Sequence, residues 1–137
     1  AMKAIWTENK PKYDGEVVQF SEMMTWPKPV QKPHPPVIVG GAFPYGARRA
    51  IRFGDGWIPL GGGRGVDIPD QIPHFRQMAA EAGRNPDDIE ISVFAARPVE
   101  EDLKKLEGAG VSRVTFDLPS APSDEILPLL DKLARMI

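Results

Sequence analysis

Residues 37–60 read VIVGGAFPYGARRAIRFGDGWIPL. The apolar run Val37-Ile38-Val39 is stopped by two glycines, and a segment with helical spacing follows. Gly54-Asp55-Gly56 ends that segment before a second apolar run begins at Trp57. Short apolar runs bounded by glycine are typical of buried strands. The stretch therefore predicts strand, helix and strand in succession, which is the repeat of a parallel sheet with helical crossovers.

The same alternation continues to the end of the chain. Further strands are expected at 89–94 and within 111–118. Helices are expected before, between and after them, with Gly83 and Gly110 as C-terminal caps. In the last helix we expect Pro128 within about one turn of the start, because a proline deeper in a helix loses a hydrogen bond and clashes.

Four strand–helix units suit two α/β architectures. A doubly wound sheet usually has at least five strands, whereas a (β/α)8 barrel needs about 250 residues, of which 137 is roughly half. We therefore predict the C-terminal half of a (β/α)8 TIM barrel, about four βα units in residues 37–137, preceded by an irregular hairpin and proline-rich segment in residues 1–36. Residues 1–137 then form a single partial-barrel domain. A small complete doubly wound domain that binds another phosphate ligand is the alternative.

Composition narrows the function classes. The 17 Lys+Arg residues nearly balance the 19 Asp+Glu residues, for a formal charge of −2, which disfavours electrostatic binding of nucleic acid or membrane surfaces. The absence of cysteine excludes disulfides, thiolate metal sites and thiol catalysis, and two distant histidines predict no metal site. Without an apolar secretory segment at the start, the expected compartment is the cytoplasm.

The pair Gly40-Gly41, directly before a predicted helix, is the sequence feature most suggestive of a binding site. Glycines let backbone N–H groups approach an anion, and a helix N-terminus favours negative charge. The spacing matches neither the dinucleotide fingerprint nor a P-loop, and the glycines could equally serve only to turn the chain from strand to helix. A second candidate is the loop from Gly61 to Gly65 with Arg64, whose alternative is a flexible loop with a solvated arginine.

No catalytic residue emerges from the pattern. The sequence contains neither a nucleophile–base pair nor a paired-carboxylate motif, so the reactive chemistry must come from a cofactor or from a part of the protein that is absent. His74 is expected at the surface, and His34, which lies among prolines with no carboxylate or hydroxyl partner at a recognisable spacing, is not expected to be catalytic. Arg48, Arg49 and Arg52 share one short helix and could reach an anionic ligand, although a solvated helix face is the safer expectation.

Several motifs resemble the luciferase-like monooxygenase family. They are WPKPVQKPHPPVIVGG at 26–41, ARRA at 47–50, GDGW at 54–57, EAGRNP at 81–86 and GAGVSRV at 108–114. The resemblance covers nearly the whole chain and is strongest for the branch that uses the deazaflavin coenzyme F-420, with FMN-dependent enzymes as close relatives. It implies a (β/α)8 barrel, generally dimeric, that transfers hydride to or from a small organic substrate with its cofactor at the C-terminal ends of the strands.

The resemblance also implies roles for individual residues. Gly40, Gly41 and the backbone of Ala42 are expected near the cofactor phosphate, and Gly61, Gly62 and Arg64 are expected to flank the same end. It supplies no catalytic residue, because the substrate-facing residues of the family come largely from the first half of the barrel.

We therefore expect the C-terminal part of a flavin- or deazaflavin-dependent oxidoreductase, with FMN or coenzyme F-420 as cofactor. Its expected partner is a second copy of the chain or the missing N-terminal half, and without that partner we expect little or no activity. The alternative is a non-catalytic structural or assembly protein that kept the fold.

Overall fold

The computed structural model describes residues 1–61 and 67–136. The chain forms two compact units, Ala1–Pro36 and Val37–Ile137. The first unit contains the helix α1 (Met2–Thr7) and an antiparallel hairpin of β1 (Tyr13–Asp14) and β2 (Gln19–Phe20). The proline-rich segment of this unit is tied to α1, because the Lys28 Nζ donates hydrogen bonds of 2.6 Å to the carbonyl oxygen of Ile5 and to the Thr25 hydroxyl.

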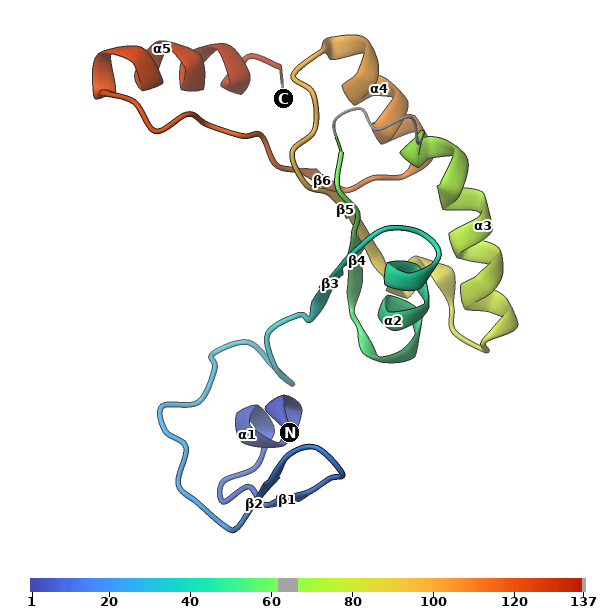
Figure 1. Cartoon of the computed structure of the whole chain (residues 1–137), viewed down its shortest axis with the longest axis vertical. Coiled ribbons are helices and arrows are strands. Elements are labelled where there is room, and N and C mark those ends of the chain that lie inside the picture. The colour runs from blue at the N-terminus through green and yellow to red at the C-terminus, as the bar shows by residue number, and fades with distance from the viewer. Residues whose placement is uncertain (62–66, 137) are drawn as a thin grey trace. The chain divides into compact units, whose positions relative to one another are not determined.

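The second unit contains a parallel sheet in the order β3-β4-β5-β6 with helices between the strands (Figure 1). Each strand pairs with the next one along the chain, and Val39 lies opposite Trp57, which lies opposite Ile91. The elements are β3 (Ile38–Gly40), α2 (Tyr45–Phe53), β4 (Gly56–Ile58), α3 (Ile68–Glu81), a 3-10 turn (Pro86–Asp88), β5 (Glu90–Val93), α4 (Glu100–Ala109), β6 (Arg113–Val114) and α5 (Ser123–Ala134).

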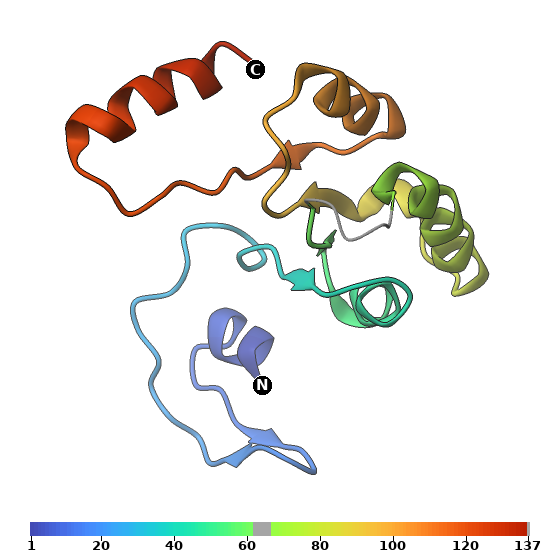
Figure 2. The same ribbon diagram turned by 45° about the horizontal axis from the view of Figure 1, so that its top comes forward.

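The core of this unit lies between the sheet and three helices. Helices α2, α3 and α4 follow one another along the same side of the sheet (Figures 1 and 2). Val39, Trp57 and Ile91 contribute the strand side of the core, and the Trp57 ring stacks on Phe75 of α3 with centroids 5.0 Å apart. The apolar stripes on the helices, separated by residues that turn to solvent, explain why the helices pack there.

The structure agrees with the predicted glycine caps but not with the predicted position of Pro128. Gly83 and Gly110 adopt φ of +74° and +93° at the ends of α3 and α4, as expected of C-terminal caps. The expectation for Pro128 is wrong, because Pro128 lies inside α5 as the sixth residue of the helix, which begins at Ser123. The missing N–H deprives only the carbonyl of Asp124, which lies in the exposed first turn, where water can replace the partner.

Candidate functional site

The Gly40–Gly41 turn lies at the carboxyl end of β3 and leads into α2. Gly40 and Ala42 are exposed and Gly41 is half-buried. Gly41 has a φ of +128°, a backbone conformation that residues with a Cβ adopt only with strain. The carboxyl ends of parallel strands are where open α/β sheets and barrels place their ligands, so the turn occupies the end of the sheet at which a site is expected.

Two side chains hold the carbonyls of this turn. The indole Nε1 of Trp57 donates a hydrogen bond of 2.9 Å to the carbonyl oxygen of Gly41, and the Arg49 Nη2 donates one of 2.7 Å to the carbonyl oxygen of Gly40. The amide groups of Ala42 and Phe43 donate no hydrogen bond to any residue in 1–61 or 67–136. The turn therefore combines fixed carbonyls, one adjacent guanidinium and two backbone donors that have no partner in the part of the chain that the structure describes.

Gly46 in the first turn of α2 lets the helix approach the glycine turn. A Cβ at Gly46 would overlap the carbonyl carbon and oxygen of Gly41 and would lie 2.9 Å from the Gly41 Cα. The amide of Gly46 meanwhile donates a hydrogen bond of 2.7 Å to the carbonyl oxygen of Ala42. Only glycine allows this approach, so the position of the helix N-terminus next to the turn depends on the residue at 46.

The second predicted loop begins at Gly61, which follows β4 at the same end of the sheet. Its amide donates a hydrogen bond of 2.6 Å to the carbonyl oxygen of Phe94, and a Cβ at this position would meet the Val93 side chain at 2.8 Å. Gly61 is therefore packed against the end of β5. Gly62 and Arg64, the other residues predicted for this loop, lie outside the described residues.

Two apolar side chains that the sequence analysis did not single out lie at this end of the sheet. Leu60 and Phe94 are paired by an isolated parallel bridge and are 61% and 49% exposed. They alternate with the buried residues Pro59 and Val93, so they face away from the helices. The alternation was present in the sequence, but it did not indicate which face of the strands would lack a covering helix.

Arg49 is a site component that the sequence analysis named only as the less favoured of two alternatives. The three arginines of α2 were expected to form a solvated face, but Arg49 contacts the glycine turn whereas Arg48 and Arg52 line a hollow between α2 and α3. Arg48 and Arg49 are neighbours in the sequence, but their side chains lie in different places. The Arg49 side chain extends back past the start of α2 to the turn, whereas the Arg48 side chain lies toward α3.

Two further polar side chains of the second unit, those of Asp55 and His74, have structural partners. The Asp55 carboxylate accepts a hydrogen bond of 2.7 Å from the amide of Val37, which fixes the start of β3. His74 is exposed on α3, as expected, and its ring lies 6.4 Å from that of Phe43. Within residues 1–61 and 67–136, no three His, Asp or Glu side chains are placed to hold a metal ion. No helix in the same ranges is both long and apolar enough to cross a membrane.

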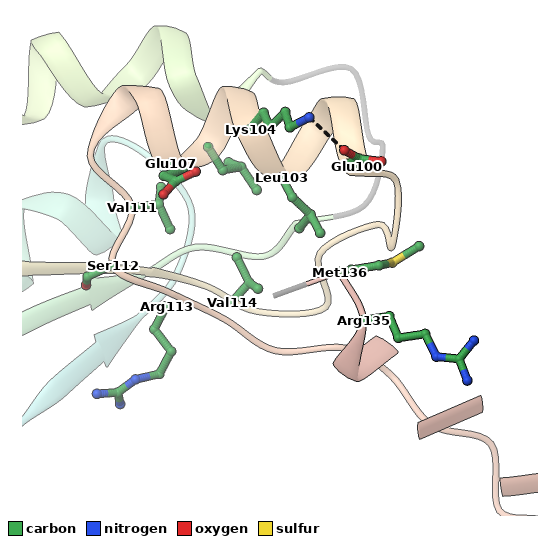
Figure 3. Close-up of a pocket in the computed structure, with 11 residues that line it drawn as sticks. Glu100, Leu103, Lys104, Glu107, Val111, Ser112, Arg113, Val114, Arg135 and Met136 are labelled. Atoms are coloured by element: carbon green, nitrogen blue, oxygen red, sulfur yellow. Dashed lines mark hydrogen bonds and ion pairs between the residues drawn. The ribbon is translucent and has the colours of Figure 1, made fainter. Parts of the chain in front are cut away.

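A hollow of about 610 Å³ lies at the other edge of the sheet, between α4 and β6 (Figure 3). Leu103, Val111 and Val114 form much of its apolar wall, and Arg135 and Met136 line it from the end of the chain. The Glu100–Lys104 ion pair of 2.6 Å borders it. Because β6 and β3 are the opposite edges of the sheet, this hollow is separate from the Gly40–Gly41 turn.

Comparison with known proteins assigns the chain to a family. The sequence profile of the luciferase-like monooxygenases matches residues 1–107. The chain belongs to the luciferase-like monooxygenase family. An uncharacterized protein of Mycobacterium tuberculosis (strain ATCC 25618 / H37Rv) is 38% identical over 144 residues, which cover 100% of this chain and 48% of that protein. The FMNH(2)-dependent dimethylsulfone monooxygenase of Pseudomonas putida is 32% identical over 76% of this chain and 28% of its own length.

Solved structures agree on the fold. The monooxygenase RslO1 from Streptomyces bottropensis superposes with a TM-score of 0.68 at 17% identity, over 98% of this chain and 57% of that one. An F420-dependent secondary alcohol dehydrogenase gives a TM-score of 0.51 at 15% identity, over 98% and 50%. The chain thus spans about half the length of the curated relatives it matches. The predicted fold class, about four βα units of a (β/α)8 barrel, is confirmed.

Proposed function

We propose that this chain is the C-terminal, cofactor-phosphate-binding part of a flavin- or deazaflavin-dependent oxidoreductase that transfers hydride to or from a small organic substrate. The observation that carries the proposal is the turn from Gly40 to Phe43 at the carboxyl end of β3. It offers the guanidinium of Arg49 and the amides of Ala42 and Phe43, which have no partner among the described residues. Relatives that use FMN or F420 make these two cofactors the candidates, and both carry a phosphate on their side chain.

The residues of the turn fit a phosphate group. The amides of Ala42 and Phe43 would donate to its oxygens, and Arg49 would add charge while its other contact keeps the Gly40 carbonyl in place. Hydrogen bonds to a charged group contribute about 1.5–3 kcal/mol each, so two or three of them suffice to orient a cofactor tail. The hydride chemistry is that of the cofactor ring, and the chain supplies binding and orientation.

The apolar pair at the same end of the sheet suits the ring of such a cofactor. Leu60 and Phe94 expose apolar surface where a planar ring would otherwise contact water, and we propose that they cover one part of it. Gly61, and with it Gly62 and Arg64 of the following loop, would flank the tail. The catalytic groups that contact substrate would come from outside this chain.

We further propose that the chain works only after it pairs with another four-stranded half, either a second copy or an N-terminal half. Within the second unit, β3 and β6 are both edge strands of the sheet. Unpaired edges bind other strands readily, and closing a barrel removes both edges at once. Little hydride transfer is expected from the chain without its partner.

Titration of the purified chain with FMN and with coenzyme F-420, followed by fluorescence, tests the proposal. Saturable binding of either cofactor is expected, and Arg49→Gln should weaken it about tenfold, since one charge-assisted hydrogen bond is lost. Arg135→Gln is the matched control, because it removes one exposed arginine at the opposite edge of the sheet, and it should leave the affinity within twofold. Absence of binding to both cofactors would instead favour a non-catalytic assembly protein that kept the fold.

Light scattering on the same sample tests the pairing. A dimer is expected if a second copy provides the other half, with cofactor binding that rises as the dimer forms. A monomer that binds cofactor would point to a separate N-terminal half, and a monomer that binds neither cofactor would contradict both parts of the proposal.

A further inference from the structure

A second hollow, of about 450 Å³, lies between α2 and α3 on the helix layer, away from the glycine turn. It is lined by Arg48, Ile51, Arg52, Met78, Ala82 and Arg84. Three of these six side chains are guanidinium groups in a chain whose net charge is −2. Arg48 and Arg52 belong to α2, while Arg84 comes from the turn after α3, so the fold and not the sequence alone brings the three together.

None of the three guanidinium groups forms an ion pair with a residue in the described parts of the chain. Arg48 lies 6.0 Å from the ring of Tyr45. The Arg84 Nη1 donates to the carbonyl oxygens of Ala50, Ile51 and Gly54 at 3.3, 3.0 and 2.8 Å. Its Nη2 and Nε donate no hydrogen bond to the same described residues. Arg84 is therefore a fixed, half-buried cation, and its Nη2 and Nε have no acceptor in the described parts of the chain.

Negative charges near this hollow oppose the binding of an anion. Their sum is therefore compared with the charge of the three arginines. Glu81 adjoins Ala82, but its carboxylate accepts a hydrogen bond of 2.8 Å from Gln77. The C-termini of α2 and α3 each carry about half a negative charge, and the contacts of Arg84 offset that of α2. Three full positive charges against about two negative ones leave the hollow electropositive.

The floor of the hollow is apolar. Ile51 is 6% exposed and Met78 is half-buried, so a ligand that reached the arginines would also cover aliphatic surface. Arginine binds phosphate with two parallel N–H donors, and its aliphatic stem packs against apolar groups.

From this arrangement we propose that the α2–α3 hollow binds a phosphate ester with a small apolar body. The phosphate lies between Arg48, Arg52 and the free side of Arg84, and the apolar body lies on Ile51 and Met78. This site is distinct from the proposed cofactor site, because the only arginine of α2 that contacts the glycine turn is Arg49.

Titration of the isotope-labelled chain with phenyl phosphate, followed by amide NMR shifts, tests the proposal and locates the ligand. Saturable shifts are expected at residues 48–54 and 78–84, with an affinity that falls as salt is added. The double variant Arg48→Gln/Arg52→Gln should weaken binding at least tenfold. Arg135→Gln, which removes a guanidinium elsewhere, should change it less than twofold.

Three outcomes would overturn the proposal. The first is the absence of saturable shifts at these residues, and the second is unchanged binding by the double variant. The third is inorganic phosphate binding as tightly as phenyl phosphate, which would remove the role of the apolar floor. Shifts confined to residues 40–46 would report the cofactor turn instead, so failure at this hollow is separable from failure of the proposed function.

Discussion

The indole Nε1 of Trp57 donates a hydrogen bond of 2.9 Å to the carbonyl oxygen of Gly41. Trp57 is fully buried, and its ring stacks on Phe75 at 5.0 Å. The largest side chain of the core therefore also fixes the turn at the carboxyl end of β3. Packing and site geometry are coupled through this one residue, so a change that loosens the core beneath β4 also loosens the turn.

Replacing Trp57 with phenylalanine should separate these two contributions. The Trp57→Phe variant keeps an aromatic ring but leaves the Gly41 carbonyl without its donor, which costs about 1–3 kcal/mol in addition to the lost apolar area. Urea unfolding measures the loss, and FMN titration should show weaker binding. Trp26→Phe is the control, because Trp26 is 59% exposed and its replacement should change stability by less than about 0.5 kcal/mol. Equal effects of the two variants would contradict the structural role given to the indole N–H.

Alanine at two helical glycines should act with opposite signs. Gly46→Ala would overlap the Gly41 carbonyl, and such overpacking costs about 1–3 kcal/mol. Gly108→Ala in α4 meets nothing within 4 Å, so it should stabilise the chain by up to about 1 kcal/mol through helix propensity. Thermal unfolding of the two variants checks the prediction, and stabilisation by both would show that α2 does not press against the turn.

Much of the fold was predictable because its signals are local. Apolar runs ended by glycine identify β3 and β4, and the glycines at 83 and 110 end their helices by adopting positive φ. The depth of Pro128 was not predictable, because the cost of a helical proline depends on whether the deprived carbonyl is exposed. That exposure follows from tertiary packing, which the sequence pattern does not report.

The candidate site was predictable only in outline. Gly40 and Gly41 stand out because glycines after a strand are recognisable in the sequence. Arg49 and Trp57 contact the same turn from 9 and 16 residues away, and no spacing rule relates them to it. Arg84 likewise reaches the end of α2 from 30 to 34 residues away. Contacts made by long side chains across elements require the fold before they can be seen.

Arg84 should stabilise the end of α2. Its Nη1 serves three carbonyl oxygens of the last turn and of the residue after it, and Arg84→Met would leave them without that donor. A loss of about 1.5–3 kcal/mol is expected, as for hydrogen bonds to a charged group. Arg52→Met is the matched control, since Arg52 is exposed and should contribute less than about 0.5 kcal/mol. Denaturant unfolding measures the stability of both variants. Similar unfolding midpoints for Arg84→Met and Arg52→Met would refute a capping role for Arg84.

Two ion pairs along α4 have predictable titration behaviour. The hydrogen bond from Lys104 lowers the pKa of Glu100 below its ordinary 4.5, and that from Lys105 does the same to the pKa of Glu101. In return, the pKa values of Lys104 and Lys105 lie above their ordinary 10.5. The pairs therefore contribute stability that is present above pH 4.5 and is lost as the pH falls through the lowered carboxyl values. At the alkaline end, the contribution is present below pH 10.5 and is lost as the pH rises through the raised amine values.

The Glu100–Lys104 and Glu101–Lys105 pairs can be broken separately by substitution. In each variant the pair that is left intact serves as the control. In Lys104→Gln the pKa of Glu100 should rise toward 4.5 while that of Glu101 stays low, and Lys105→Gln should do the reverse. NMR titration of the side-chain carboxyl carbons measures both groups in one sample. Because all four side chains are exposed, added salt should reduce both shifts. If Lys104→Gln moved both carboxyl pKa values equally, the shifts would come from the overall charge of the helix and not from the individual hydrogen bonds.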